Sequence, residues 1–157
     1  MTTNKKVLDF IQETKELCQP DNIVWVDGSE EQLEAFRQQA VDQKILIKLN
    51  QEKLPGCYLH RTTVNDVARV EGRTFICSKN KEDSAPINNW METTEAENLM
   101  KDLFKGVMKG RTLYVIPYSM GAVGSKFSKI GIELTDSIYV VLNMAIMTRV
   151  GKAVIDA

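Results

Sequence analysis

Arg61 carries a side chain that could hold a small acidic molecule, and it stands in a polar stretch, residues 60–66. A guanidinium stays charged at any working pH and can bind a carboxylate through two parallel hydrogen bonds. The residue types alone favour a plainer role, an exposed ion pair with Asp66 or Glu71, because such pairs are common on protein surfaces. The neighbouring His60 has no partner that marks it as a catalyst, so we expect a solvated or packing histidine.

A second candidate for chemistry is the glycine-rich segment GAVGSK at residues 121–126. A phosphate-binding loop needs four residues between its two glycines and a lysine directly after the second glycine. Here Gly121 and Gly124 are separated by two residues, and Ser125 stands between Gly124 and Lys126. The pattern therefore does not support an independent nucleotide-binding domain, and we assign no cofactor-binding residue to it.

Three charged residues spaced two apart, Arg69, Glu71 and Arg73, form a third group. On a strand, side chains two apart lie on the same side. We therefore expect a structural charge cluster that holds the base of the Arg61 loop, and no catalytic residue there.

The cysteines and the histidine do not have the spacing of a metal site. Cys18, Cys57 and Cys77 form no close pair, and the chain has one histidine. Zinc ligands are usually grouped at shorter intervals. We therefore expect reduced thiols in a cytoplasmic protein, with no metal ligand in this sequence.

Composition limits the class of protein. The chain has 157 residues, of which 43% are hydrophobic and 26% charged, which is ordinary for a globular domain with a core. Twenty basic against twenty-one acidic residues give a net charge of −1, which argues against a nucleic-acid module. No apolar run approaches the roughly 20 residues of a membrane span. We expect one α/β domain over residues 1–157, with a mixed sheet flanked by helices, that binds neither nucleic acid nor membrane.

Periodicity and turn residues predict the elements that must position Arg61. In the first half they are a helix capped by Thr3 and ended by Pro20, a strand at 23–26, a helix with a capping box at Ser29 and Gln32, and a strand at 45–50. In the second half they are a turn at Val67–Val70, a strand at 73–77, a polar loop at 79–89, a helix capped by Thr93 or Thr94, strands at 112–118 and 132–134, and a helix capped by Ser137.

Several large side chains have packing as their expected role. In the last helix we expect Val140, Val141, Met144 and Met147 to face inward, and we expect Gly151 to weaken that helix near its end. Trp25 and Trp90 are also expected to pack in the core.

Five stretches of the sequence, in order, resemble the GTP-dependent phosphoenolpyruvate carboxykinases, especially the bacterial type. They cover nearly the whole chain: NIVWVDGS (22–29); HRT (60–62) with DVARVE (66–71); RTFICS (73–78) with NNWM (88–91); MKGRTLYVIPYSMG (108–121); and SKIGIELTDS (128–137) with MTR (147–149). One such stretch is weak evidence, whereas five in order are specific.

The resemblance implies the fold of that family's N-terminal domain and the conversion of oxaloacetate and GTP to phosphoenolpyruvate, GDP and carbon dioxide in gluconeogenesis. It implies a monomeric enzyme that uses Mn²⁺, with a second divalent ion bound to the nucleotide. Arg61 matches the family's substrate-binding arginine on a mobile loop. The family's metal ligands, phosphate loop and guanine-binding aromatics belong to later sequence, so we expect neither metal nor nucleotide on this chain and no activity from it alone.

The sequence departs from the family at Ala122 and Lys126, where proline is usual. It also stops within or just after a helix, so we expect a truncated N-terminal fragment. The alternative is a non-enzymatic truncated paralogue that binds an anion or another protein.

Overall fold

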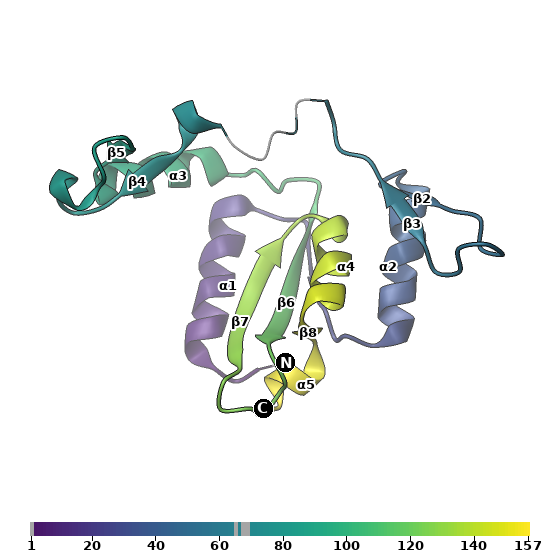
Figure 1. Cartoon of the computed structure of the whole chain (residues 1–157). Coiled ribbons are helices and arrows are strands. Elements are labelled where there is room, and N and C mark those ends of the chain that lie inside the picture. Colours follow the sequence, from purple (N-terminus) through teal and green to yellow (C-terminus); the bar gives the residue numbers. More distant parts are fainter. Residues whose placement is uncertain (1, 65, 67–69) are drawn as a thin grey trace.

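The computed structural model describes residues 2–64, 66 and 70–157. Helices and strands are interspersed along the chain, as expected for an α/β protein (Figure 1). The elements are α1 (Lys5–Cys18), β1 (Asn22–Trp25), α2 (Glu30–Asp42), β2 (Leu46–Lys48), β3 (Tyr58–His60), η1 (Glu71–Arg73), β4 (Phe75–Cys77), η2 (Lys81–Asp83), β5 (Asn89–Met91), α3 (Thr93–Phe104), β6 (Thr112–Met120), β7 (Lys129–Thr135), α4 (Ile138–Met147), β8 (Arg149–Val150) and α5 (Lys152–Ile155).

The central sheet is mixed, and β6 is its middle strand. β1 runs parallel to the first half of β6, whereas β7 is antiparallel to it from Tyr114 to Met120. β8 pairs with Tyr118 and Ser119. β7 also pairs with these two residues, so β8 must lie on the opposite edge of β6 from β7. This is the edge that β1 occupies at the N-terminal end of β6. The predicted mixed sheet flanked by helices is confirmed.

Side chains alternate across β6 and supply two separate cores. Tyr114 and Ile116 pack with α2 and α4 in the larger cluster, while Leu113 packs with Cys18 and Met108 in the smaller one. Successive residues of a strand point to opposite faces, so one strand can serve both. Figure 1 shows the sheet between α1 on one side and α4 and α2 on the other.

The helices begin close to the predicted positions, with three corrections to their caps. Ser29 caps α2 by accepting a hydrogen bond from the Gln32 amide, as predicted, although the Gln32 side chain bonds to Asp27 and Trp25 instead of closing the box. Asn4, not Thr3, caps α1. Glu92 caps α3 in place of Thr93 or Thr94 because its carboxylate accepts from the Thr94 and Glu95 amides.

The C-terminal segment corrects two expectations. Val141 is buried, but Met147 is 67% exposed, because α4 ends there and the chain turns into β8. Gly151 lies beyond α4, with φ of 95°, at the start of α5. There its amide donates to Pro117, and the next amide, of Lys152, donates to Asp27, which ties this segment to β6 and to the β1–α2 turn.

Two extensions flank the central sheet on opposite sides (Figure 1). β2 and β3 form an antiparallel hairpin beside α2, and β4, β5 and α3 form an arm. The sequence reading missed β3, β5 and the short helix η2 inside the predicted polar loop. Trp90 is only half-buried in the arm, where its indole donates to Ser78 at 2.9 Å, and Trp25 is also half-buried, so neither is a core residue.

Glycine is required where the β1–α2 turn meets the C-terminal segment. A Cβ on Gly151 would overlap the carbonyl oxygen of Asp27, and its backbone has positive φ. Gly151→Ala should therefore cost at least the roughly 1–3 kcal/mol of a strained backbone, with the overlap added. Gly124→Ala, with positive φ but open space, should cost about 1–2 kcal/mol. Gly72→Ala has neither problem and should be near neutral. Urea unfolding of the three variants checks this order, and equal effects would contradict it.

Candidate functional site

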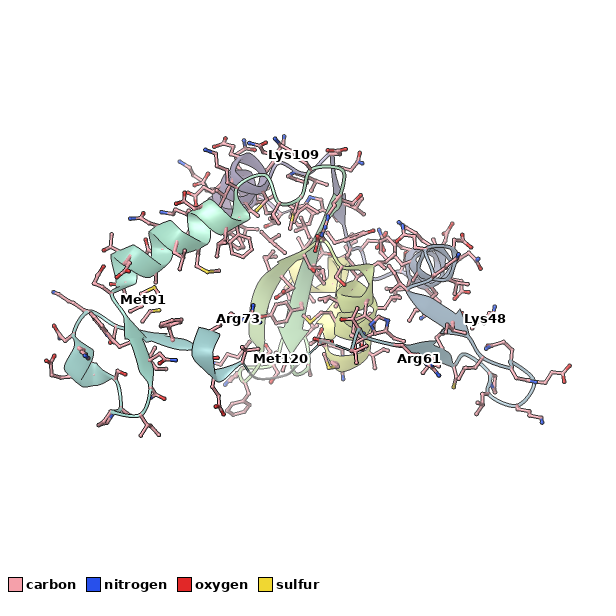
Figure 2. All side chains as sticks on the ribbon, turned by 90° about the horizontal axis from the view of Figure 1, so that it is seen from above. Lys48, Arg61, Arg73, Met91, Lys109 and Met120 are labelled. Carbon is pink, nitrogen blue, oxygen red and sulfur yellow. The ribbon has the colours of Figure 1, made fainter. Side chains whose placement is uncertain are left out.

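The β2–β3 hairpin sets the position of Arg61. Asn50 and Gln51 shape the hairpin loop: Asn50 accepts from the amides of Glu52 and Lys53, and Gln51 bonds to Gly56 and Cys57. The last paired residue of β3 is His60, opposite Leu46. Arg61 follows directly, at the end of the hairpin nearest the central sheet, while Lys48 lies farther out (Figure 2).

His60 is anchored by two elements outside its own strand. Its Nδ1 donates to the carbonyl oxygen of Ile45 at 2.7 Å. A carbonyl can only accept, so Nδ1 carries the proton. Its ring stacks on Tyr139 in the first turn of α4, with 4.0 Å between centroids and 26° between planes. Of the two expected roles, packing is the one the structure shows.

The side chain of Arg61 is exposed to solvent. Among the described residues, no ion pair joins it to Asp66, Glu71 or any other carboxylate. The plainer role that the residue types favoured is thus absent from this part of the chain. An exposed guanidinium directly after an anchored residue is suited to binding a carboxylate that arrives from solution.

The expected charge cluster is not supported. Glu71–Arg73 is a turn of 3₁₀ helix, so the premise of a strand is wrong, and Arg69 lies outside the described residues. Arg73 lies on the far side of the central sheet from Arg61 (Figure 2). Within the described part of the chain, neither Glu71 nor Arg73 has an ion-pair partner. The Glu71 carbonyl oxygen accepts a hydrogen bond from the Asn89 side chain, through Nδ2, at 2.8 Å instead.

A groove of about 840 Å³ runs between α2, the hairpin and α4. His60 and Tyr139 line it, but Arg61 does not. Arg37 also lines the groove, and its guanidinium is bound to Glu30 at 2.5 Å and to Glu34 at 2.8 Å. The hydrogen bonds that the Arg37 guanidinium donates to these two carboxylates raise its pKa. With its charge already balanced, Arg37 is a poor candidate to hold an acidic ligand.

The glycine-rich segment is a loop between two strands, β6 and β7. A phosphate loop leads from a strand into a helix, whose first amide groups bind the phosphate. The element that follows Lys126 is the strand β7 and not a helix, so the segment does not fit a nucleotide. Its own side chains and amides bond within the loop: the Ser125 amide donates to Ala122 at 3.1 Å and the Ser128 hydroxyl to Ser125 at 2.8 Å.

Metal-binding side chains do not come together in the part of the chain that is described: it holds no group of three or more His, Cys, Asp or Glu placed around one point. These residues therefore do not fit a Mn²⁺ centre. Cys18, Cys57 and Cys77 are free thiols. Burial raises the pKa of Cys18, which keeps that thiol protonated. None of the described helices has the length and apolarity needed to cross a membrane.

Comparison with known proteins identifies the domain. Residues 9–157 match the family described as phosphoenolpyruvate carboxykinase N-terminal domain. That match covers nearly the whole chain, and the chain belongs to this family.

Relatives named "Phosphoenolpyruvate carboxykinase [GTP]" support the same assignment. The chain is 50% identical over 155 residues to the one from Anaeromyxobacter sp. (strain K), which covers 99% of the chain and 26% of the relative. It is 52% identical over 155 residues to the one from Corynebacterium kroppenstedtii, covering 99% and 25%. For Neocallimastix frontalis the values are 50% over 153 residues, covering 98% and 25%. The chain therefore spans about a quarter of the length of these relatives.

The loop after β6 gives a test of backbone stiffness. Among the described residues, the amides of Ala122 and Lys126 donate no backbone hydrogen bond. Ala122→Pro and Lys126→Pro should each stabilise the fold by about 0.4–1 kcal/mol, because proline restricts the unfolded chain. Ser125→Pro removes the bond to Ala122 and should destabilise it. Thermal unfolding measures all three, and destabilisation by both of the first two variants would show that the loop backbone is incompatible with proline.

Proposed function

We propose that this chain is the N-terminal part of a cytoplasmic GTP-dependent phosphoenolpyruvate carboxykinase, and that Arg61 binds the carboxylate of oxaloacetate and phosphoenolpyruvate. The observation that carries the proposal is the exposed Arg61 guanidinium directly after the anchored His60. Family membership and the shared name of the relatives support the reaction.

The proposed reaction explains why a cation is needed here. Loss of carbon dioxide from oxaloacetate leaves an enolate, and that enolate then takes a phosphoryl group. Oxaloacetate and phosphoenolpyruvate both keep a carboxylate beside the reacting centre. A guanidinium can hold that group in two-point contact through the reaction without changing its own charge. Arg61 thus serves substrate binding and orientation, not proton transfer.

The remaining functions fall to other parts of the full-length protein. The described residues fit neither a Mn²⁺ centre nor a phosphate loop. In this proposal, Mn²⁺, GTP and its divalent ion are bound by a later part of the full-length protein. That part corresponds to the roughly three quarters of the relatives that this chain does not span. The chain contributes a folded support and one positively charged side chain, that of Arg61.

The isolated chain should be inactive and should not bind GTP. An assay with oxaloacetate, GTP and Mn²⁺ should show no turnover above a control without protein, because neither metal nor nucleotide has ligands among the described residues. Calorimetry should show no saturable heat with millimolar GTP. Micromolar, metal-dependent GTP binding that is lost in Lys126→Ala would contradict this prediction and assign a nucleotide site to the loop.

Arg61→Ala in the full-length protein should mainly weaken the handling of oxaloacetate and phosphoenolpyruvate. A hydrogen bond to a charged group contributes about 1.5–3 kcal/mol, so KM or kcat/KM should change by about 10- to 150-fold. Arg61→Lys should recover only part of the loss. It keeps the positive charge, but an ammonium cannot make the planar two-point contact. The KM for GTP should stay the same. Lys48→Ala, another exposed cation of the hairpin, is the matched control and should leave both KM values unchanged. Normal substrate kinetics for Arg61→Ala would refute the assignment.

A further inference from the structure

We propose that His60 is a positioning residue for Arg61: its contacts with Ile45 and Tyr139 fix the point from which the arginine reaches the substrate. This inference rests on the proposed function of Arg61. It adds a role for a side chain that itself touches neither substrate nor metal.

The anchor joins three parts of the chain that are far apart in sequence. His60 ends β3, Ile45 precedes β2, and Tyr139 lies in α4. The half-buried imidazole meets the Ile45 carbonyl at 2.7 Å through Nδ1 and packs flat on the phenol ring of Tyr139. The first contact needs a donor at a defined place in the side chain, and the second needs a flat ring. Histidine supplies both, whereas an aliphatic residue of similar size supplies neither.

Tyr139 is itself part of a rigid support. Its helix, α4, is capped by Ser137, whose hydroxyl accepts a hydrogen bond from the Val140 amide. Ile138 and Val141 on the same helix are 2% and 0% exposed in the larger core. The helix that carries the Tyr139 ring is therefore held by the packed interior, although the ring itself is partly exposed.

His60 is the last point at which the hairpin is held before Arg61. β3 has no ladder pair after His60, and η1, the next element in the described part of the chain, begins at Glu71. Consecutive Cα atoms are about 3.8 Å apart, and the peptide between them is planar. A shift of the His60 backbone is therefore passed to the Arg61 backbone almost undiminished. Binding through a two-point contact is sensitive to displacements of about 1 Å.

A merely structural role for His60 predicts a different result from a positioning role. If the anchor only stabilises the hairpin, its loss lowers the melting temperature and affects all kinetic parameters alike. If the anchor positions Arg61, its loss raises the KM for oxaloacetate and phosphoenolpyruvate, leaves the KM for GTP unchanged, and has no further effect once Arg61 is removed.

The test uses the full-length protein with His60→Ala, His60→Asn, Tyr139→Ala and Arg61→Ala, and with the double variant His60→Ala/Arg61→Ala. His60→Ala and Tyr139→Ala should each raise the KM for oxaloacetate about 3- to 10-fold, the effect of losing about one hydrogen bond or its equivalent. Asparagine can donate from nearly the position of Nδ1, so His60→Asn should keep much of the wild-type affinity. Ile146→Ala, at an 80% exposed position of α4 that lines the same groove, is the control and should behave as wild type.

The double variant separates this inference from the proposed function. Its KM for oxaloacetate should equal that of Arg61→Ala alone, because residues that act through one contact are not additive. A multiplied effect, or a normal KM in a stably folded His60→Ala, would overturn the positioning role while leaving Arg61 as the substrate ligand. If Arg61→Ala itself has normal substrate kinetics, the proposed function fails, and the inference fails with it.

Discussion

The pairing of β6 on both of its edges is the interaction on which the rest of the structure depends. β1 and β8 occupy one edge and β7 the other, so the strand is covered on both sides. Leu113, Val115 and Ile116 are 0% exposed, which at roughly 25 cal/mol per Å² makes this strand a large contributor to hydrophobic stabilisation. The strand also holds α4 in place, since Tyr114 and Ile116 share a core with Ile138 and Val141.

A continuous series of contacts leads from that strand to solvent. α4 packs on the sheet, Tyr139 projects from α4, His60 stacks on Tyr139, and Arg61 follows His60. Binding residues are commonly carried by exposed segments that a rigid scaffold positions. Here the scaffold contact made by His60 is one peptide away from Arg61, the proposed binding residue. A guanidinium can thus stay hydrated and accessible while the attachment of its backbone is fixed.

The sequence predicted the strong local signals and missed those that arise only in three dimensions. The β-branched and aromatic run at 112–118 and the Ser29 cap are local, and both were correct. The three-residue strands β3 and β5 carry too few residues for a period to show, and they exist because they pair with β2 and β4. Met147 was expected inside because helical spacing was followed to the last residue of α4, where the chain turns into β8 and leaves that side chain exposed.

The candidate site also combines features that local sequence predicts with contacts that arise only in three dimensions. Arg61 was identified from its resemblance to a family motif, and from residue type alone it would have been assigned a surface ion pair. The contact of His60 with Tyr139 spans 79 positions, and the sequence around either residue does not predict it. Rejection of a phosphate loop at residues 121–126 needed only the spacing of two glycines and a lysine. The structure adds the physical reason, which is that the loop leads into a strand.

The most direct test is a crystal structure of the full-length protein with phosphoenolpyruvate bound. The Arg61 guanidinium should lie within about 3.2 Å of the ligand carboxylate, in hydrogen-bonding geometry. His60 should keep its bond to the Ile45 carbonyl and its stack on Tyr139 in that complex. A carboxylate held by other cations, with Arg61 remaining in solvent, would contradict the proposal that this domain supplies the arginine that binds substrate.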